Sequence, residues 1–242
     1  MLRLKAINGI MLRPSIWKRC SSNNAISQFI RQNQEISQST VFQGTLYELT
    51  VMRELSEKLN MSQLQKVGGS HDRGVDIRGQ WPLNYLFGQV NKVVSLDDVP
   101  KRCKIHGTTL KPLRRKIDEN DGKLDPLKAL VQCKAFSGSK VSPREFRELV
   151  GTFASLVPDS QRNHSIIMMS SPNLLTRDGL SLINTIKVPL IYLRIEMLQR
   201  MGDNYDMEKS GRLLNYYEND YAAALLQGCG VKEWLKLSLY RR

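Results

Sequence analysis

Ala129-Leu130-Val131-Gln132-Cys133-Lys134-Ala135-Phe136, residues 129–136, is the stretch that decides the fold. Its apolar residues predict a buried β-strand. Gln132 and Lys134 interrupt that strand on one side, because side chains alternate along a strand. The stretch Gly74-Val75-Asp76-Ile77-Arg78 has the same character, with an acid between two apolar residues. We therefore expect two core strands, each carrying polar side chains.

The segments around these strands extend the pattern into an α/β order. Ser142-Pro143-Arg144-Glu145 is a capping box with proline at the first helical position, so it predicts the start of a helix. Periodicity predicts helices over 42–60 and 177–186, and strands over 64–67, 75–81, 165–170 and 189–195. This order predicts an α/β fold with a mixed central sheet flanked by helices in three layers.

Composition limits the classes of partner. The 242 residues give room for one core with extensions. They carry 36 Lys and Arg against 23 Asp and Glu, a formal net charge of +13. This balance indicates a polyanion, first nucleic acid and second an anionic membrane surface. No apolar run approaches the roughly 18 residues of a membrane span. The scattered cysteines Cys20, Cys103, Cys133 and Cys229 favour neither structural zinc nor a disulfide framework.

The two ends of the chain differ from its middle. Residues 1–34 contain six basic residues and no acid, which is typical of a mitochondrial transit segment, assigned to 1–24. The alternative is a basic arm that binds nucleic acid in the mature protein. The polar residues 25–41 predict a linker, and 42–200 the folded core. The spacing of apolar residues over 207–227 predicts a helix within a C-terminal extension, 201–242.

An insertion at about residues 88–128 separates the two polar strands. Its middle holds seven basic residues and no acid: Lys101, Arg102, Lys104, Lys111, Arg114, Arg115 and Lys116. Such a cluster favours contacts with nucleic-acid phosphates, and a solvated loop is the alternative. Aromatic residues do not alternate with these charges, which favours contact with duplex or junction backbone over stacking of single-stranded bases.

Four polar residues have the side chains that phosphodiester hydrolysis requires. A divalent cation can neutralise charge and prepare a water, and Mg²⁺ or Mn²⁺ prefers oxygen ligands. Glu48 and Asp76 would supply carboxylates, and Gln132 and Cys133 their carbonyl oxygens. Lys134 would stabilise charge at phosphorus, because acting as a base would require burial or a cation to favour loss of its proton.

Each of these residues also has a structural explanation. Asp76 would pair with Arg73 or Arg78, Glu48 would pair with Lys134, and the strand glutamine would bond to backbone. Four polar side chains on otherwise buried elements would then each need a separate partner to offset the free-energy cost of burial. Taken together they favour a metal-dependent nuclease.

The stretches 44–48, 68–77 and 131–134 resemble the PD-(D/E)xK nuclease superfamily. The similarity is greatest to its Mrr-type restriction endonucleases and archaeal Holliday-junction resolvases. The resemblance implies a restriction endonuclease-like fold, with Glu48 and Asp76 as metal ligands and Lys134 as the catalytic lysine. Gln132 would take a position where most members have a carboxylate and Mrr-type members commonly have glutamine. The insertion replaces a short hairpin of that family.

The chain as a whole also resembles a fungal mitochondrial family required for respiratory growth. We therefore expect a Mg²⁺- or Mn²⁺-dependent endonuclease that acts on mitochondrial DNA in the matrix, with His71 and Arg73 facing the substrate. A homodimer would let it address both strands. The alternatives are a catalytically inactive nucleic-acid-binding protein of the same fold, and a mitochondrial assembly or scaffold factor.

Overall fold

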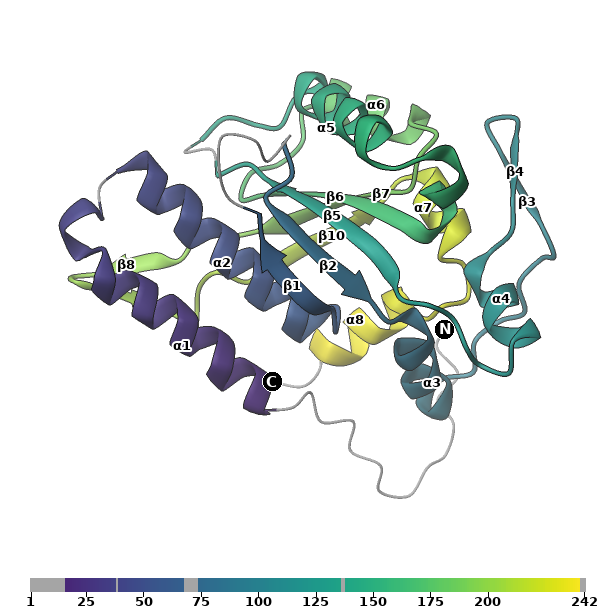
Figure 1. Ribbon diagram of the computed structural model, residues 1–242, viewed down its shortest axis with the longest axis horizontal. Coiled ribbons are helices and arrows are strands. Elements are labelled where there is room, and N and C mark those ends of the chain that lie inside the picture. Colours follow the sequence, from purple (N-terminus) through teal and green to yellow (C-terminus); the bar gives the residue numbers. More distant parts are fainter. Residues whose placement is uncertain (1–15, 38, 68–73, 136–137, 240–242) are drawn as a thin grey trace.

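A mixed six-stranded sheet forms the centre of the protein. Figure 1 shows the computed structural model, which describes residues 16–37, 39–67, 74–135 and 138–239. The strands are β1 (Ser62–Lys66), β2 (Ile77–Trp81), β5 (Leu127–Cys133), β6 (Ser165–Ser171), β7 (Leu190–Ile195) and β10 (Leu213–Glu218). They lie in the order β1-β2-β5-β6-β7-β10. β5, β6 and β7 are parallel, and the other neighbours pair antiparallel. The predicted mixed α/β fold is confirmed.

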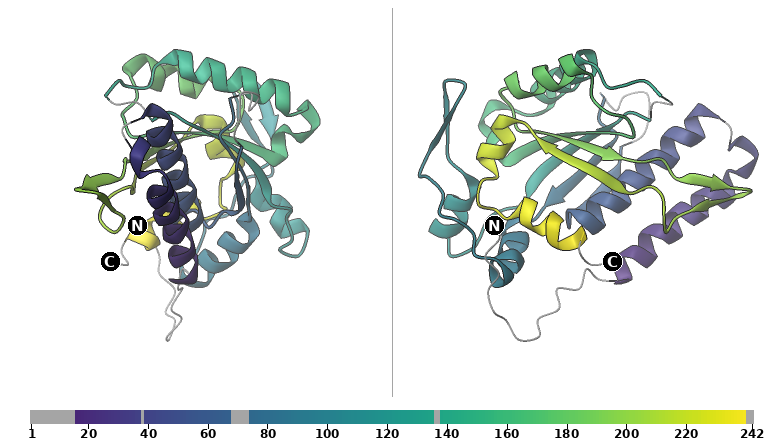
Figure 2. Two further views of the ribbon diagram at one scale, coloured as in Figure 1. Left: turned by 60° about the vertical axis from the view of Figure 1, so that its left-hand side comes forward. Right: turned by 180° about the vertical axis from the view of Figure 1, so that it is seen from behind.

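Helices cover both faces of this sheet. One face packs against α2 (Thr40–Lys58) and α8 (Val231–Leu239), and the other against α5 (Pro143–Leu156) and α6 (Arg177–Thr185) (Figures 1 and 2). Alternate side chains of β5 pack into the hydrophobic cores on the two faces of the sheet. Ala129 and Val131 belong to the core that contains α2, and Leu130 packs against the core that contains α5. We call these the α2 face and the α5 face.

The start of α5 follows directly from its sequence. The Ser142 side chain accepts a hydrogen bond from the Arg144 N–H, and the Ser142 N–H donates to Glu145 Oε2 at 2.8 Å. Pro143 takes the first helical position, where a missing N–H costs nothing. The predicted capping box is therefore confirmed, and it fixes the direction in which α5 crosses the sheet.

The insertion between β2 and β5 is an ordered unit. It contains α3 (Leu83–Val93), a hairpin of β3 (Cys103–Ile105) and β4 (Thr108–Leu110), and α4 (Leu113–Glu119). The Arg114 guanidinium lies over the Phe87 ring, 4.1 Å from its centroid, and donates to the Gly228 carbonyl at 3.4 Å. The insertion thus packs against the C-terminal part of the chain. Its hairpin lies beyond the end of β2, away from residue 77 (Figure 1).

The helix predicted over 207–227 is wrong. This segment forms β10, which pairs antiparallel with β7, followed by the short α7 (Asp220–Leu225). The Asn219 side chain starts α7 by accepting the Ala222 N–H at 2.8 Å. Tyr216 and Tyr217 favour a strand, and pairing with β7 outweighs the helical spacing of the apolar residues.

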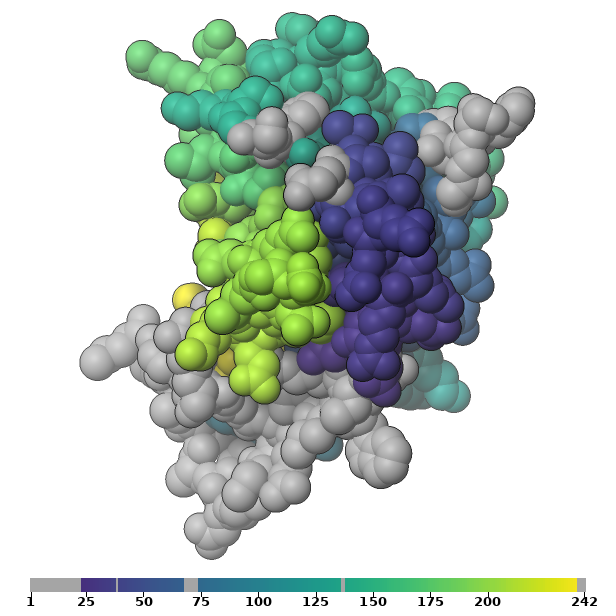
Figure 3. Space-filling model, turned by 90° about the vertical axis from the view of Figure 1, so that its left-hand side faces the viewer, coloured from purple at the N-terminus to yellow at the C-terminus, as the bar shows by residue number. Residues whose placement is uncertain are grey.

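The polar linker predicted over 25–41 is also wrong, because α1 (Ile16–Gln32) and a 3₁₀ turn (Gln34–Ile36) occupy most of it. Ile26 and Ile30 are buried in a cluster with Phe42 of α2, and the Phe29 and Phe42 rings stack with centroids 5.0 Å apart. Figure 3 shows this pair of helices beside the arm of β8 (Gln199–Met201) and β9 (Asn204–Asp206). A few apolar residues at helical spacing suffice to dock a polar helix.

The transit segment stays a prediction, and residues 1–15 lie outside the described ones. Within the described ranges, no helix combines the length and apolar character needed to cross a membrane.

Candidate functional site

The candidate site lies at the end of the sheet where β5 ends and β2 begins. Asp76 directly precedes β2. Its N–H donates to the Val131 carbonyl at 2.9 Å, and its Oδ2 accepts the Cys133 N–H at 2.6 Å. A charge-assisted bond of this length holds the carboxylate in one place. Asp76 is therefore a fixed charge beside the last residues of β5.

Gln132 has a buried amide oxygen that lacks a partner. The residue is 6% exposed, and its Oε1 accepts no hydrogen bond from any group that the structure describes. Gly74 closes over the amide with φ +76°, and a Cβ there would lie 3.4 Å from Gln132 Nε2 and 3.2 Å from Thr152 Oγ1. An unsatisfied buried acceptor costs about 1–3 kcal/mol. A water or a hard cation is the kind of partner that would satisfy it.

Glu48 approaches the same end of the sheet from α2. Its Oε2 lies 2.9 Å from Lys66 Nζ on β1, and Lys66 also donates to Thr45 Oγ1 at 3.0 Å. Glu48 is therefore paired with Lys66, which the sequence did not suggest, rather than with Lys134. The Glu48 side chain is 17% exposed and the Lys66 side chain 34%, although Glu48 Oε2 itself is buried.

The negative charges of Asp76 and Glu48 both act on the Cys133 thiol. Burial raises the pKa of this thiol well above the usual value, and the negative charges of Asp76 and Glu48 raise that pKa further, while Lys66 lowers it. A thiol senses these charges only at short range. The end of β5 thus lies within the field of both acids.

Lys134 follows β5 on the α5 face. Its N–H donates to the Ser170 carbonyl at 2.8 Å, and its Nζ lies 3.8 Å from Glu148 Oε2. Glu148 also pairs with Arg144 at 3.0 Å. The Lys134 side chain is 24% exposed, so the amine is open to a ligand. The predicted residues therefore surround the end of β5 from both faces.

The oxygen donors of this site suit a hard cation, although they are few. Among the described residues, no group of three or more His, Cys, Asp and Glu side chains is placed to hold a metal ion. The oxygen donors available to a cation are the carboxylates of Asp76 and Glu48 and the unpartnered amide oxygen of Gln132. Lys66 already neutralises Glu48. A cation would compete with that lysine. His71 and Arg73, predicted to face the substrate, lie outside the described residues.

The seven basic residues of the insertion fall into two groups. Four are paired, three of them within the insertion and one outside it: Lys111 with Glu119, Arg114 with Asp118, Arg115 with the Val99 carbonyl, and Lys116 with His164. The other three are exposed on or beside the β3–β4 hairpin: Lys101, Arg102 and Lys104. The hairpin lies beyond the end of β2 (Figure 1), and Asp76 directly precedes the start of that strand, so the exposed group lies away from the candidate site.

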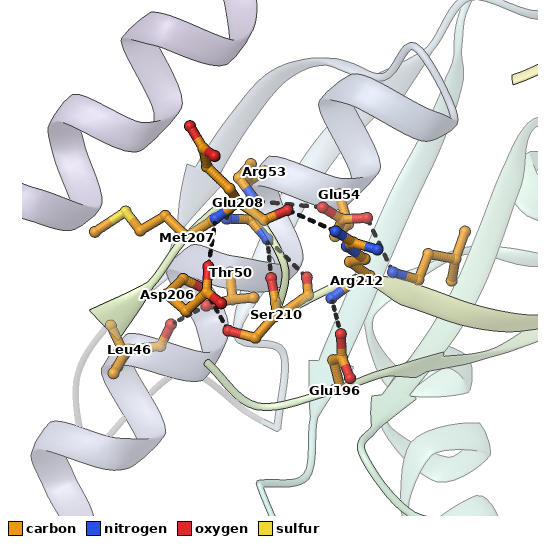
Figure 4. Close-up of polar contacts among 12 residues, drawn as sticks. Leu46, Thr50, Arg53, Glu54, Glu196, Asp206, Met207, Glu208, Ser210 and Arg212 are labelled. Carbon is orange, nitrogen blue, oxygen red and sulfur yellow. Dashed lines mark hydrogen bonds and ion pairs between the residues drawn. The ribbon is translucent and has the colours of Figure 1, made fainter. Parts of the chain in front are cut away.

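A second polar cluster on α2 was not predicted from the sequence. Arg53 and Glu54 are each 3% exposed and form an ion pair of 3.2 Å. Arg53 also donates to the carbonyls of Met207, Ser210 and Gly211 at 3.1, 3.2 and 2.8 Å (Figure 4). An adjacent Arg and Glu on a helix usually lie in solvent, so no local pattern indicated this burial. The cluster fastens 207–211 to α2.

The family model described as Required for respiratory growth protein 7 matches residues 39–226. The chain belongs to this family. It is 87% identical over 242 residues to the Required for respiratory growth protein 7 of Zygosaccharomyces rouxii, covering 100% of both chains. Identity to the Saccharomyces cerevisiae S288c protein is 51% over 236 residues, 96% of this chain and 97% of that one. Identity to the Kluyveromyces lactis protein is 46% over 218 residues, with coverage of 90% and 92%.

All three relatives are named as mitochondrial. Residues 39–226 include Glu48, Asp76, Gln132 and Lys134, so the match to the Required for respiratory growth protein 7 family contains the whole candidate site. A solved structure, the MspJI restriction endonuclease in complex with a 27-mer oligonucleotide, aligns with 78% of this chain and 33% of its own. The TM-score is 0.32 and the identity 11%, so the fold assignment is taken from the strand order and pairing described above and not from this alignment.

Proposed function

We propose that this family member is a mitochondrial metal-dependent endonuclease that hydrolyses phosphodiester bonds of DNA. The observation that carries the proposal is the buried, unpartnered Oε1 of Gln132 at the end of β5, next to the fixed carboxylate of Asp76. The names of the relatives support a role in mitochondria and in respiratory growth. Maintenance of the organelle genome in the matrix would connect the two.

Mg²⁺ or Mn²⁺ suits the donors present, since all of them are oxygens. Asp76, Glu48, the amide oxygen of Gln132 and the carbonyl of Cys133 would hold it. A bound divalent cation supplies charge neutralisation and an activated water. Lys66 would have to release or share the Glu48 carboxylate, which is feasible because both side chains are partly exposed.

Lys134 would stabilise negative charge on the phosphate under attack. Its present partner, Glu148 Oε2, is 3.8 Å away, beyond the length of a good hydrogen bond. The amine is therefore loosely held and can turn toward a phosphate. Removing one well-placed donor to a developing charge typically lowers kcat by about 10² to 10³.

Cleavage of linear duplex, branched and single-stranded DNA in Mg²⁺ and in Mn²⁺ tests the proposal. We expect wild-type protein to cut at least one substrate, and Asp76→Asn to cut about 10²-fold more slowly or worse. Asparagine keeps an oxygen that can accept the Cys133 N–H, so the variant should fold. Lys134→Gln should also lose activity. Glu148→Gln is the matched control, because it alters the neighbour of Lys134 without removing a proposed ligand.

The competing function is binding without catalysis. The Lys66–Glu48 ion pair favours it, since a site with a lysine on its carboxylate resembles a site that has lost its metal. Wild-type protein that binds DNA with a steep salt dependence and never cuts, in either metal, would overturn the nuclease proposal in favour of this function. Absence of binding even at low salt would favour an assembly or scaffold role.

A further inference from the structure

A groove of about 450 Å³ crosses the α5 face of the sheet beside the candidate site. Residues from β1, β2, β5, the end of α5, the segment between α5 and β6, and the first residue of β6 form its walls. Those that matter here are Gln65, Arg78, Gln80, Lys128, Gln161 and Ser165. Among the described residues, none of the predicted catalytic and metal-binding residues lines it, and none of the seven basic residues in the middle of the insertion does.

The register of β2 on β5 makes this groove continuous with the candidate site. Ile77 pairs with Val131 at the site end, followed by Arg78 with Leu130 and Gln80 with Lys128. Residues opposite one another share a face, and every second residue of a strand returns to it. Arg78, Gln80 and Lys128 thus continue the α5 face on which Gln132 lies. From Asp76 to Gln80 the distance is about 13 Å, roughly four nucleotides along B-form DNA.

The chemistry of the groove is cationic. Arg78 and Lys128 are exposed in its walls, and the lining residues that the structure describes include no Asp or Glu. Lys128 Nζ donates to Gln161 Oε1 at 3.0 Å, which leaves its other protons for a ligand. A third cation lies near the far end, where Lys116 Nζ is 3.0 Å from Nε2 of His164, the neighbour of Ser165.

A buried hydroxyl gives an independent sign of a ligand. Ser165 is 0% exposed, it belongs to the groove wall, and its Oγ has no hydrogen-bond partner among the described groups. Buried hydroxyls are nearly always satisfied, so this one requires a partner such as a ligand oxygen or an ordered water in the groove. The described lining residues include no aromatic side chain, which favours contact with phosphates over contact with stacked bases.

We infer that this cationic groove holds the phosphate backbone of a nucleic-acid strand that runs from the end of β5 toward the basic insertion. The direction of the strand rests on the proposed function, because the scissile phosphate would lie at Asp76. The binding does not depend on catalysis. The groove joins the two features that the sequence had left apart, the polar strands and the basic cluster.

Fluorescence anisotropy of a labelled duplex and a labelled single strand, each titrated over a range of KCl concentrations, tests this inference with the full chain. The double variant Arg78→Gln/Lys128→Gln should weaken binding. It should also reduce the slope of log K against log salt by about 1.8 on duplex or about 1.4 on single-stranded DNA, for two lost phosphate contacts. The DNA form on which the slope falls by the full amount expected for that form is the one that the groove holds. Lys92→Gln/Lys209→Gln, which removes the same charge from exposed positions outside the groove, should change the slope much less.

Two further variants separate the explanations. Ser165→Ala leaves the charge unchanged, so we expect weaker DNA binding with an unchanged slope of log K against log salt. Urea denaturation will verify that the variant folds. Asp76→Asn should abolish DNA cutting while the double variant Arg78→Gln/Lys128→Gln still reduces the slope of log K against log salt in its background. Loss of catalysis and loss of binding are therefore distinct results. Equal slopes for the groove pair and the control pair on both DNA probes would overturn the inference, whatever the cleavage assay shows.

Discussion

Helix α2 carries two polar clusters that differ in one respect. At Arg53 and Glu54 every charged group is buried and paired: the guanidinium contacts a carboxylate and three carbonyls, and Glu54 Oε2 accepts the Leu213 N–H at 2.9 Å. At Glu48 the side chain is 17% exposed, and the buried amide oxygen of Gln132 at the end of β5 has no partner among the described residues. Within the part of the chain that the structure describes, one cluster is complete and the other is not.

The difference separates structural from functional polarity. A buried charge is tolerated when its partners are supplied by the fold, and then removing one partner is costly. A buried group left unsatisfied by the described residues lowers stability unless a water or a ligand completes it. On this criterion Arg53 holds the fold together, and we expect a ligand at the end of β5.

The largest expected effect is at the complete cluster. Arg53→Met should lower the free energy of unfolding by about 3–5 kcal/mol, because Glu54 is left buried without its cation. Urea denaturation measures the change. Arg53→Met combined with Glu54→Leu should recover much of the loss. A single variant as stable as wild type would show that the two clusters of α2 do not differ as argued.

Gln132 should respond in the opposite direction. Gln132→Leu removes an unsatisfied acceptor and should raise the free energy of unfolding by about 1 kcal/mol, while any cutting activity falls. Gln132→Glu, the matched change, should lower stability without a metal and strengthen Mn²⁺ binding, measured by calorimetry. If both variants are destabilised equally with and without Mn²⁺, the amide oxygen has a purely structural role.

A smaller effect is expected at Lys66. Its ion pair with Glu48 is partly exposed, so Lys66→Met should change stability by no more than about 1 kcal/mol. Freed from its cation, Glu48 should bind Mn²⁺ more tightly. Calorimetry on Lys66→Met and on Lys58→Met, a lysine at the end of the same helix as Glu48, provides the comparison. Identical Mn²⁺ affinities would exclude Glu48 as a ligand.

The subtlest test uses pH. Because Asp76 and Glu48 raise the pKa of the Cys133 thiol, Asp76→Asn or Glu48→Gln should lower that pKa, and Lys66→Met should raise it. The folded thiol keeps its proton at a pH where the unfolded thiol has lost it. Stability therefore decreases as pH rises above about 8.5, and less so in the two acid variants. The Cβ chemical shift of Cys133 followed by NMR against pH measures this. Unchanged midpoints would mean that the carboxylates do not converge.

Local patterns predicted much of the fold. The helix expected over 42–60 is α2 at Thr40–Lys58, and the strand alternation that placed Gln132 and Lys134 on one side of β5 is also found. These signals depend only on near neighbours. The strand β10 was missed because its pairing with β7 decides its conformation. Helix α1 was missed because Ile26, Phe29 and Ile30 pack against residues distant in the sequence, on α2 and in 198–207.

The site was predictable in the same measure. The proximity of Asp76 to the end of β5 follows from two strands with polar residues at matching ends, and the contact with Cys133 agrees with it. The Lys66–Glu48 pair was not foreseen, since β1 has the polar sequence Ser62-Gln63-Leu64-Gln65-Lys66 and little alternation to show which side chains turn inward. The periodicity of a sequence cannot predict side-chain pairs that form only because two distant elements meet at the sheet.

The Arg53 cluster also has a consequence for how the polypeptide reaches its native state. The carbonyls that Arg53 binds lie 154 to 158 residues further along the chain. Until that late segment has emerged, the guanidinium cannot be buried without cost, so α2 cannot settle on the sheet during early synthesis or translocation. Contacts of such long range slow folding and leave apolar surface exposed meanwhile. We expect the nascent or newly imported protein to depend on chaperones until residue 211 is available.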